Sequence, residues 1–339
     1  MRDMNNINFS DLQQLISSAG PILLTTHINP DCDGLGSEIA LYHHLRSIGK
    51  ECRIINTSGM RDMYNFLDLE GHTEKYSPDM DDWIKSADIT ILLDIGDANR
   101  IGNMKEIVFE NTRTICIDHH PVRKGNSYTY TMVNLHEPST GSIIWKYLRS
   151  LDSESKLTIP IATALYAALV TDTGSFKYYN TNEEAHEMAS DLIISGIIPY
   201  DIHKHIYENR SLEQVRLLGR VIENINFYNN GEFVLFIITL FDLEQCRATH
   251  EDIEGFTDFC RSIRGVEISC MILEESENNF RINFRSKGKY IINDVAEKLN
   301  GGGHPLAAGA NILNQSVTDA EKTILTLINK KIRGDDDVS

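Results

Sequence analysis

Short apolar segments alternate with amphipathic stretches through the first part of the chain. Five of them are candidate strands, at residues 21–27, 51–56, 88–95, 113–118 and 128–134. Residues 35–48 carry apolar side chains at helical spacing and stop at Gly49, which predicts a helix directly after the first strand. This alternation is typical of a mostly parallel sheet with helices on both faces. We therefore predict an α/β domain over residues 1–195.

The pattern changes after residue 195. Residues 196–228 are rich in charge and are interpreted as a helical linker. Beyond the linker, strands are expected at 233–240, 266–273 and 280–285, and helices near 251–263, 291–299 and 317–331. Residues 229–333 are thus predicted to form a smaller α/β domain, followed by an acidic tail at 334–339. A substrate cleft is expected between the two domains.

Carboxylates and histidines gather where the apolar segments of the first domain end. They occur in four motifs, THINPDCDG at 26–34, LLDIGD at 92–97, IDHH at 117–120 and TDTG at 171–174. Because ligands bind outside the carboxyl ends of strands in open α/β sheets, these motifs are expected to meet at one sheet edge. A buried helix at 160–170 would deliver Asp172 to the same edge. Imidazole and carboxylate groups suit Mn²⁺, Mg²⁺ or Zn²⁺, so the sequence predicts one shared metal site.

Composition narrows the class of protein. A chain of 339 residues suggests about two domains. The net charge of −17 argues against a protein that coats long nucleic acid or binds a long duplex, whereas bound cations would still allow a small anionic substrate. The six cysteines form no CxxC pair, and there is neither a signal peptide nor an apolar run of ~18 residues. We expect a cytoplasmic protein that does not enter a membrane.

The order of the motifs resembles a known family. HxNPDxDG, an aspartate closing a strand, DHH and TDTG are followed by NGGGHPLAAG at 300–309. This series resembles the DHH phosphoesterase superfamily with its C-terminal DHH-associated domain, and within it the nano-RNase branch of oligoribonucleases and pAp phosphatases. The resemblance implies two divalent ions, with Mn²⁺ expected and Mg²⁺ or Co²⁺ as alternatives. It also implies a homodimer.

The resemblance implies an activity as well. A hydroxide held by two metals would attack phosphorus in very short oligoribonucleotides, pApA-type dinucleotides among them, and release nucleoside 5′-monophosphates. The same centre would convert 3′-phosphoadenosine 5′-phosphate (pAp) to AMP.

Matched position by position, the family pattern assigns roles to individual residues. Six side chains are assigned to metal: His27 and Asp31 on the first ion, Asp33, His119 and Asp172 on the second, and Asp94 as the bridge. His120 would face the substrate phosphate, and Asp118 would orient a neighbouring histidine.

The second domain would recognise the nucleotide. The residues assigned to this task are Arg285, Ser286, Gly301, Gly302, Gly303 and His304. A guanidinium suits a terminal phosphate, and glycines allow close approach of backbone to a phosphate. Arg281, Lys287 and Lys289 make this stretch the most basic short segment of an acidic chain.

Plainer interpretations exist for each group. The ligand set can be read as turn and helix-cap carboxylates with incidental histidines, and His120 as a core histidine. Residues 301–304 can be read as a loop between helices, and Arg285 as a solvated arginine at a strand end. Cys32 stands between two ligand carboxylates where the family commonly has glycine, and sulfur favours softer ions than manganese.

Three other functions were weighed. A manganese-type pyrophosphatase shares the metal core but carries a different C-terminal domain rich in substrate-binding lysines and arginines, and the GGGH segment argues against it. A RecJ-type exonuclease needs further nucleic-acid-binding domains and a basic track for the strand. A nucleotide-sensing module that does not hydrolyse would be expected to have lost at least one ligand carboxylate.

Overall fold

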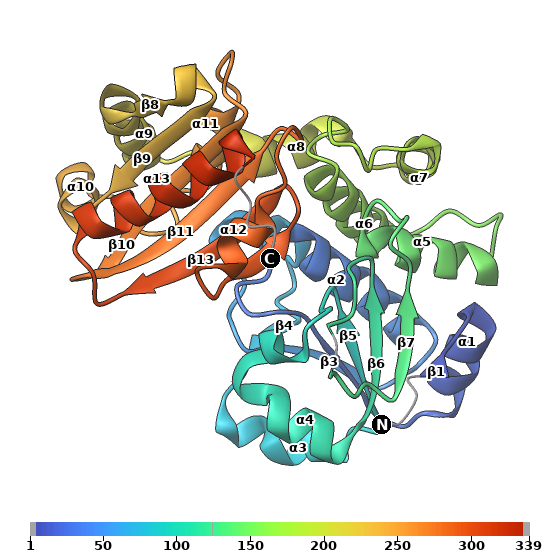
Figure 1. Ribbon diagram of the computed structural model, residues 1–339. Helices are drawn as coiled ribbons and strands as arrows, with labels where there is room; N and C mark the ends of the chain where they lie inside the picture. Colours follow the sequence, from blue (N-terminus) through green and yellow to red (C-terminus); the bar gives the residue numbers. More distant parts are fainter. Residues whose placement is uncertain (1–4, 124, 335–339) are drawn as a thin grey trace. The chain divides into compact units, whose positions relative to one another are not determined.

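The chain divides into two compact units, Met1–Asn209 and Arg210–Ser339, and each is described by itself. The computed structural model describes residues 5–123 and 125–334 (Figure 1). Apart from Gly334, the expected acidic tail therefore lies outside the described residues.

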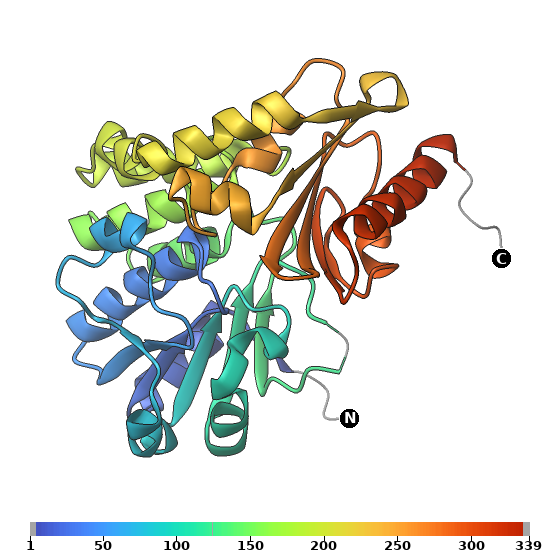
Figure 2. The ribbon, with the colours of Figure 1, turned by 90° about the vertical axis from the view of Figure 1, so that its left-hand side faces the viewer.

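A seven-stranded parallel sheet forms the centre of unit 1 (Figure 2). Its strands are β1 (Asn5–Asn6), β2 (Ile22–Thr25), β3 (Cys52–Asn56), β4 (Thr73–Lys75), β5 (Ile89–Leu93), β6 (Arg113–Asp118) and β7 (Tyr130–Val133). Their order is β1-β7-β6-β5-β2-β3-β4, so β5 lies beside both β2 and β6. The three central strands consequently end side by side, which confirms the predicted parallel α/β sheet.

Helices cover both faces of this sheet. They are α1 (Phe9–Ser18), α2 (Cys32–Ser47), α3 (Asp81–Ser86), α4 (Lys105–Asn111), α5 (Thr140–Leu151), α6 (Ile159–Asp172), α7 (Glu183–Ile194) and α8 (Pro199–Tyr207). One apolar core joins the sheet to α1, α2, α5 and α6, and a second core joins the opposite face to α3 and α4. Helix α6 is buried from Ala164 to Val170, which matches the predicted buried helix that ends near Asp172.

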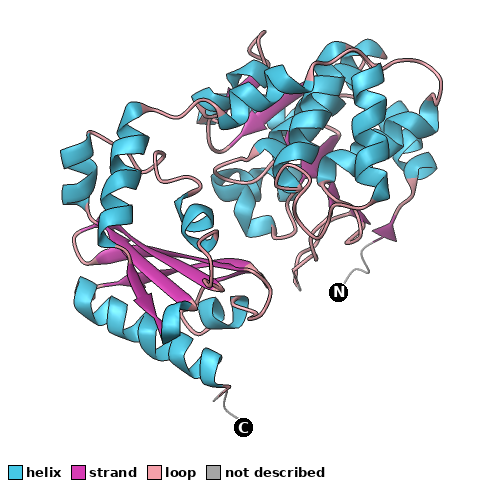
Figure 3. Cartoon of the chain, turned by 90° about the horizontal axis from the view of Figure 1, so that it is seen from above, coloured by secondary structure: helices cyan, strands magenta, loops and turns pink. Residues whose placement is uncertain are grey.

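Unit 2 is built on a mixed six-stranded sheet of order β12-β13-β11-β10-β9-β8 (Figure 3). Its strands are β8 (Asn226–Tyr228), β9 (Phe233–Ile238), β10 (Ile268–Ser276), β11 (Asn279–Ser286), β12 (Gly302–His304) and β13 (Ala307–Leu313). Its helices are α9 (Leu212–Asn224), α10 (Leu240–Cys246), α11 (Phe256–Arg261), α12 (Asn293–Glu297) and α13 (Val317–Arg333). Among the described strands of this sheet, only β9 and β10 pair in parallel. A core under α12 and α13 and another under α9 to α11 cover the two faces.

Several segments of unit 2 differ from the sequence predictions in their bounds or their type. The strand expected to reach residue 240 ends at Ile238, because Thr239 caps α10. The helix expected over 251–263 shrinks to α11, which begins after Gly255 in a left-handed conformation at φ 80°. The interpretation of residues 301–304 as a loop between helices is wrong, since residues 302–313 form the β12–β13 hairpin.

The predicted linker is helical over α8 and α9, but its last three residues form strand β8. Helix α8 belongs to unit 1 and α9 to unit 2. Within the described residues, no helix is both long and apolar enough to cross a membrane.

Candidate metal centre

Thr26 follows β2 and contacts the ends of both neighbouring strands, β3 and β5. Its backbone N–H donates to Oδ1 of Asn56 at 2.9 Å, and its hydroxyl donates to the carbonyl of Leu93 at 2.8 Å. A Cβ atom at Gly34 would lie 2.3 Å from this hydroxyl oxygen, so helix α2 begins this close to β2 only because residue 34 is glycine. His27, Asp33 and Asp94 are thereby brought to one place at the sheet edge.

Asp94 lies at the centre of the cluster. It follows β5 with a φ of 60°, a left-handed conformation that is uncommon for a residue other than glycine. Its backbone N–H donates to the carbonyl of Ile117 at 3.0 Å, and its carboxylate is buried. Such strained residues cluster at functional sites, where the surrounding structure fixes them.

The first group of ligand atoms contains His27, Asp31 and Asp94. Nε2 of His27 lies 3.5 Å from Oδ2 of Asp31 and 3.6 Å from Oδ2 of Asp94. Nδ1 of the same ring donates to the carbonyl of Ile28 at 2.9 Å, which leaves the Nε2 lone pair for a ligand. In the described part of the chain this buried Nε2 has no hydrogen-bond partner.

The second group contains Asp33, His119 and Asp172. Nε2 of His119 lies 3.7 Å from Asp33, 3.4 Å from Asp172 and 3.8 Å from Oδ1 of Asp94. Nδ1 of this ring faces the carbonyl of Glu137 at 3.2 Å, and Nε2 is again buried without a hydrogen-bond partner among the described residues. Asp94 therefore presents one oxygen to each histidine.

This donor set fits divalent cations. Two buried imidazole nitrogens without hydrogen bonds each face carboxylate oxygens, and the histidines leave them free as ligands by using Nδ1 elsewhere. Nitrogen and oxygen donors of this kind suit Mn²⁺, Mg²⁺ and Zn²⁺. The side chain of Cys32 is buried in the apolar core and belongs to none of the groups of ligand atoms among the described residues.

Repulsion between the buried carboxylates of the cluster also favours a bound cation. Burial raises the pKa of Asp33 well above its usual range, and the neighbouring carboxylate of Asp94 adds to the rise. Burial disfavours a charged His27, but Asp31 and Asp94 outweigh it and raise the pKa of His27 to about 10. In the metal-free chain, protons bound to these groups neutralise part of the negative charge of the carboxylates. A bound divalent cation would neutralise that charge instead.

The N-terminus of α5 holds the carboxylate of Asp33. Backbone N–H groups of Thr140 and Gly141 donate to its two oxygens at 2.7 and 2.9 Å, and the Thr140 hydroxyl donates to Oδ1 of Asp94 at 3.1 Å. Ser139 caps the helix by accepting the N–H of Ser142. The contact of Thr140 with the ligands was missed, and a separation of 107 residues from Asp33 offers no local signal for it.

His120 is oriented by carboxylates on one side. Nδ1 lies 3.0 Å from Oδ1 of Asp118 and 3.2 Å from Oδ1 of Asp94, while 41% of the side chain is exposed. Burial opposes a charge on this ring, but Asp118 and Asp94 outweigh it and raise the pKa of His120 to about 11. In the metal-free chain these two carboxylates therefore favour the imidazolium form of the ring.

In unit 2, Arg285 and His304 lie in one row of the sheet. Both pair with Ala307. Nε of Arg285 also lies 3.4 Å from Oδ2 of Asp258. Ser286 is fully buried, and its hydroxyl donates to the carbonyl of Tyr290 at 2.6 Å and accepts the N–H of Gly288, so this hydroxyl stabilises a turn.

The three glycines of the hairpin differ in their surroundings. A Cβ at Gly301 would lie 2.1 Å from the carbonyl oxygen of Gly309, and one at Gly303, where φ is 139°, would lie 2.6 Å from that of Ala307. A Cβ at Gly302 would meet no described atom within 4 Å. Gly301 and Gly303 are thus required by packing of the hairpin, whereas Gly302 is open to a ligand.

Comparison with known proteins agrees with the motifs. Residues 21–169 match the N-terminal domain of the DHH family, and residues 234–334 match the DHHA1 domain. The bifunctional oligoribonuclease and PAP phosphatase NrnA of Bacillus subtilis is 30% identical over 315 residues, which cover 91% of this chain and 95% of that protein. The protein of the same description from Thermus thermophilus is 27% identical over 316 residues, which cover 92% and 90%.

A solved structure shows the same fold. The crystal structure of an exopolyphosphatase-related protein from Bacteroides fragilis has a TM-score of 0.90 and 28% identity, and the match covers 97% of both chains. The fold and the paired ligand groups define a hydrolase of phosphoester bonds whose site suits divalent metal ions. The chain belongs to the DHH family and carries the DHHA1 domain, which confirms the resemblance inferred from the motifs.

Proposed function

We propose that this protein hydrolyses very short oligoribonucleotides to nucleoside 5′-monophosphates and converts pAp to AMP. The observation that carries the proposal is two adjacent groups of ligand atoms, His27, Asp31 and Asp94 in one and Asp33, His119 and Asp172 in the other, with Oδ1 of Asp94 3.8 Å from Nε2 of His119. Each group has a buried imidazole nitrogen without a hydrogen bond among the described residues. The descriptions of the relatives from B. subtilis and T. thermophilus as bifunctional oligoribonuclease and PAP phosphatase support this choice of substrates.

The metal ligands divide as their geometry suggests. In this proposal His27, Asp31 and Asp94 hold one divalent ion, most simply Mn²⁺. Asp33, His119 and Asp172 hold the other, and Asp94 reaches both. When bound, the ions supply Lewis-acid catalysis, which neutralises phosphoryl charge and activates water.

His120 is proposed to act on the substrate rather than on a metal, although its ring lies with Asp94, Asp118 and His119 in a third group of possible ligand atoms. Its imidazolium carries a proton that can be donated to a phosphate oxygen or to the leaving oxygen of the ester. Asp118 positions the ring through Nδ1, so that Nε2 is the nitrogen that meets the substrate. Thr140 holds the Asp94 carboxylate in place.

Unit 2 is proposed to recognise the nucleotide. Arg285 and His304 share a row of the sheet and would bind the terminal phosphate or sugar, with the backbone of Gly302 open beside them. Ser286, Gly301 and Gly303 would support this surface rather than contact the substrate. The acidic surface of the chain disfavours long nucleic acids, which need many cationic contacts.

Product release with Mn²⁺ tests the proposal. The substrates are a 5′-phosphorylated RNA dinucleotide, a long single-stranded RNA, pAp and pyrophosphate, with Asp94→Ala as the inactive control. Rapid cleavage of the dinucleotide and pAp with slow cleavage of the long RNA is the expected result. Cleavage of pyrophosphate alone would identify a pyrophosphatase, and nucleotide binding without turnover would identify a sensor. Substantial activity of Asp94→Ala would exclude the two-metal arrangement.

A further inference from the structure

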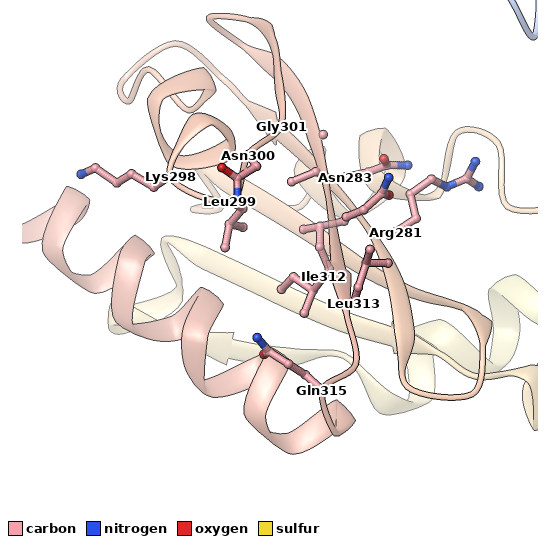
Figure 4. Close-up of a pocket in the computed structure, with 13 residues that line it drawn as sticks. Arg281, Asn283, Lys298, Leu299, Asn300, Gly301, Ile312, Leu313 and Gln315 are labelled. Atoms are coloured by element: carbon pink, nitrogen blue, oxygen red, sulfur yellow. The ribbon is translucent and has the colours of Figure 1, made fainter. Parts of the chain in front are cut away.

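Unit 2 contains a cavity of about 730 Å³ beside β13 that the proposed function leaves unused (Figure 4). Two cationic and four carboxamide side chains line it, namely Arg281, Lys298, Asn283, Asn300, Asn311 and Gln315. None of the 13 described residues that line it is acidic, although the chain carries a net charge of −17. The cavity therefore differs sharply in charge from the rest of the molecule.

The cavity continues from the row that contains Arg285. Side chains alternate between faces along a strand, so Arg281, Asn283 and Arg285 share one face of β11. Asn283 pairs with Gly309, and Arg281 pairs with Asn311. At a rise of about 3.4 Å per residue, Asn283 lies about 7 Å and Arg281 about 14 Å along the strand from Arg285.

The hairpin leaves room for a ligand at this point. Strand β12 pairs with β13 only from Ala307 to Gly309, so within the described residues the outer edge of β13 from Ala310 onward has no partner strand. Gly301 packs directly on Gly309 and Ala310 and keeps the entrance narrow on that side. The segment after α12, with Lys298 and Asn300, forms the opposite wall.

The chemistry of the lining matches one nucleotide within a strand. In Figure 4 the cationic ends of Arg281 and Lys298 lie on opposite sides of the group, with Asn283 and Asn300 between them. Guanidinium and ammonium groups bind phosphates, and carboxamides pair with the donor and acceptor edges of bases. Leu299 and Leu313 add apolar surface for a base.

Arg281 is able to bind an additional anion. Its Nε lies 3.4 Å from Oε1 of Glu275 and makes no hydrogen bond within the described part of the chain. Its side chain is 35% exposed. One loosely paired carboxylate leaves other guanidinium donors for a phosphate, because the group carries five N–H donors.

We propose that this cavity is the subsite for the nucleotide next to the terminal one in a short oligoribonucleotide. Arg281 and Lys298 bind the ribose and any phosphate on the side of this nucleotide that faces away from the scissile bond, and the carboxamides contact the base. The inference rests on the proposed function, since it places the substrate's second nucleotide beside Arg285. The subsite would contact the oligoribonucleotide but not pAp, because pAp has a single nucleoside and does not reach the cavity.

Steady-state kinetics of Arg281→Ala test the subsite. The KM for a 5′-phosphorylated di- or trinucleotide is expected to rise about tenfold, as for loss of one charge-assisted hydrogen bond, while kcat and the KM for pAp stay unchanged. Asn311→Ala, on the paired strand, should act in the same direction. Arg220→Ala is the matched control, because Arg220 is similarly exposed at 39% and ion-paired with Asp242 but lies outside the cavity lining.

Two outcomes would overturn the subsite. The first is that Arg281→Ala changes the KM for pAp and the KM for the oligonucleotide by the same factor. The second is that neither Arg281→Ala nor Asn311→Ala changes any KM, although both variants melt at the wild-type temperature. If the wild-type protein hydrolyses none of the substrates, the proposed function fails. Whether the cavity binds the second nucleotide is then tested separately, by binding of a labelled dinucleotide to full-length Asp94→Ala. Weaker binding after adding Arg281→Ala, but not after adding Arg220→Ala, supports it, and equal binding rejects it.

Discussion

Oδ1 of Asp118 accepts two hydrogen bonds from His120, one from Nδ1 at 3.0 Å and one from the backbone N–H at 2.8 Å. The carboxylate therefore fixes both the direction of the ring and the nitrogen that carries the inward proton. Because Asp118 is fully buried, this pairing is shielded from solvent.

Asp118→Asn should lower kcat for pAp by about 10- to 100-fold, as other losses of a partner that orients a catalytic or ligand histidine do. The amide oxygen still accepts a hydrogen bond, but the negative charge that favours the imidazolium is gone. Metal affinity, measured by calorimetric titration with Mn²⁺, should stay near the wild-type value. Asp97→Asn, which alters a carboxylate paired with Arg123, serves as control. A large loss of metal affinity in Asp118→Asn would make Asp118 a ligand instead.

Thr140→Val should weaken metal binding with little effect on folding. The valine has a similar shape but cannot donate to Oδ1 of Asp94, which the threonine hydroxyl reaches at 3.1 Å. Loss of such a partner typically costs about 10- to 100-fold in metal affinity. Ser139→Ala, one residue earlier, removes the helix cap and should lower stability by about 1 kcal/mol while metal affinity stays unchanged. Equal metal affinity in Thr140→Val and wild type would refute the role given to Thr140.

Glu38→Gln should become more stabilising as pH rises. Glu38 is fully buried on α2, and Oε2 accepts a hydrogen bond from Asn56 at 2.9 Å. Burial raises its pKa from 4.5 to about 8, partly offset by that hydrogen bond. The folded chain thus keeps a proton that the unfolded chain releases, so wild type loses stability as pH rises from the unfolded to the folded pKa.

Glutamine keeps the acceptor oxygen for Asn56 and does not titrate. The melting temperature of Glu38→Gln minus that of wild type should be small at about pH 5 and clearly positive at about pH 9. The comparison is made without metal at both values, so that metal binding does not contribute. A difference that does not depend on pH would show that Glu38 is not the titrating group.

Gly301→Ala should destabilise unit 2, whereas Gly302→Ala should be tolerated. The added methyl at position 301 would meet backbone atoms of Gly309 and Ala310 at 2.1 to 2.7 Å, and overpacking of this kind costs about 1 to 3 kcal/mol. Thermal unfolding monitored by circular dichroism compares the two variants. If Gly302→Ala melts like wild type yet raises KM, the backbone at residue 302 contacts the substrate. Similar melting of both variants would contradict the packing described for the hairpin.

The sequence predicted those elements whose pattern is local. The central strands β2, β5 and β6 are short apolar runs that each end at a polar motif, and α6 is a continuous apolar stretch with a proline in its first turn. Strand β13 escaped prediction because AAGANIL is rich in small residues, and its pairing with β11 supplies the stability that its own side chains lack. The roles of the ligands remain predictions from the motifs.

The pattern of apolar and polar residues did not predict contacts between residues that are far apart in the sequence. Thr140 meets Asp33 and Asp94 only because α5 starts at the same sheet edge, and nothing near Arg285 in the sequence marks Asp258 as its neighbour. Glu38 looks like an ordinary polar residue of an amphipathic helix, yet α2 is buried at that position against Asn56.

The candidate ligands are spread from residue 27 to residue 172, and the site therefore exists only in folded unit 1. A cation that binds this site and not the unfolded chain stabilises the fold by mass action, by about 2.7 kcal/mol at a hundred times its Kd. None of the six candidate ligands belongs to unit 2, so bound metal contributes directly only to the stability of unit 1. The concentration of divalent metal in the cell would thus set the stability of unit 1. At low metal concentration unit 1 would unfold more often and be cleaved by proteases more readily, whereas unit 2 has no bound metal of this kind to lose.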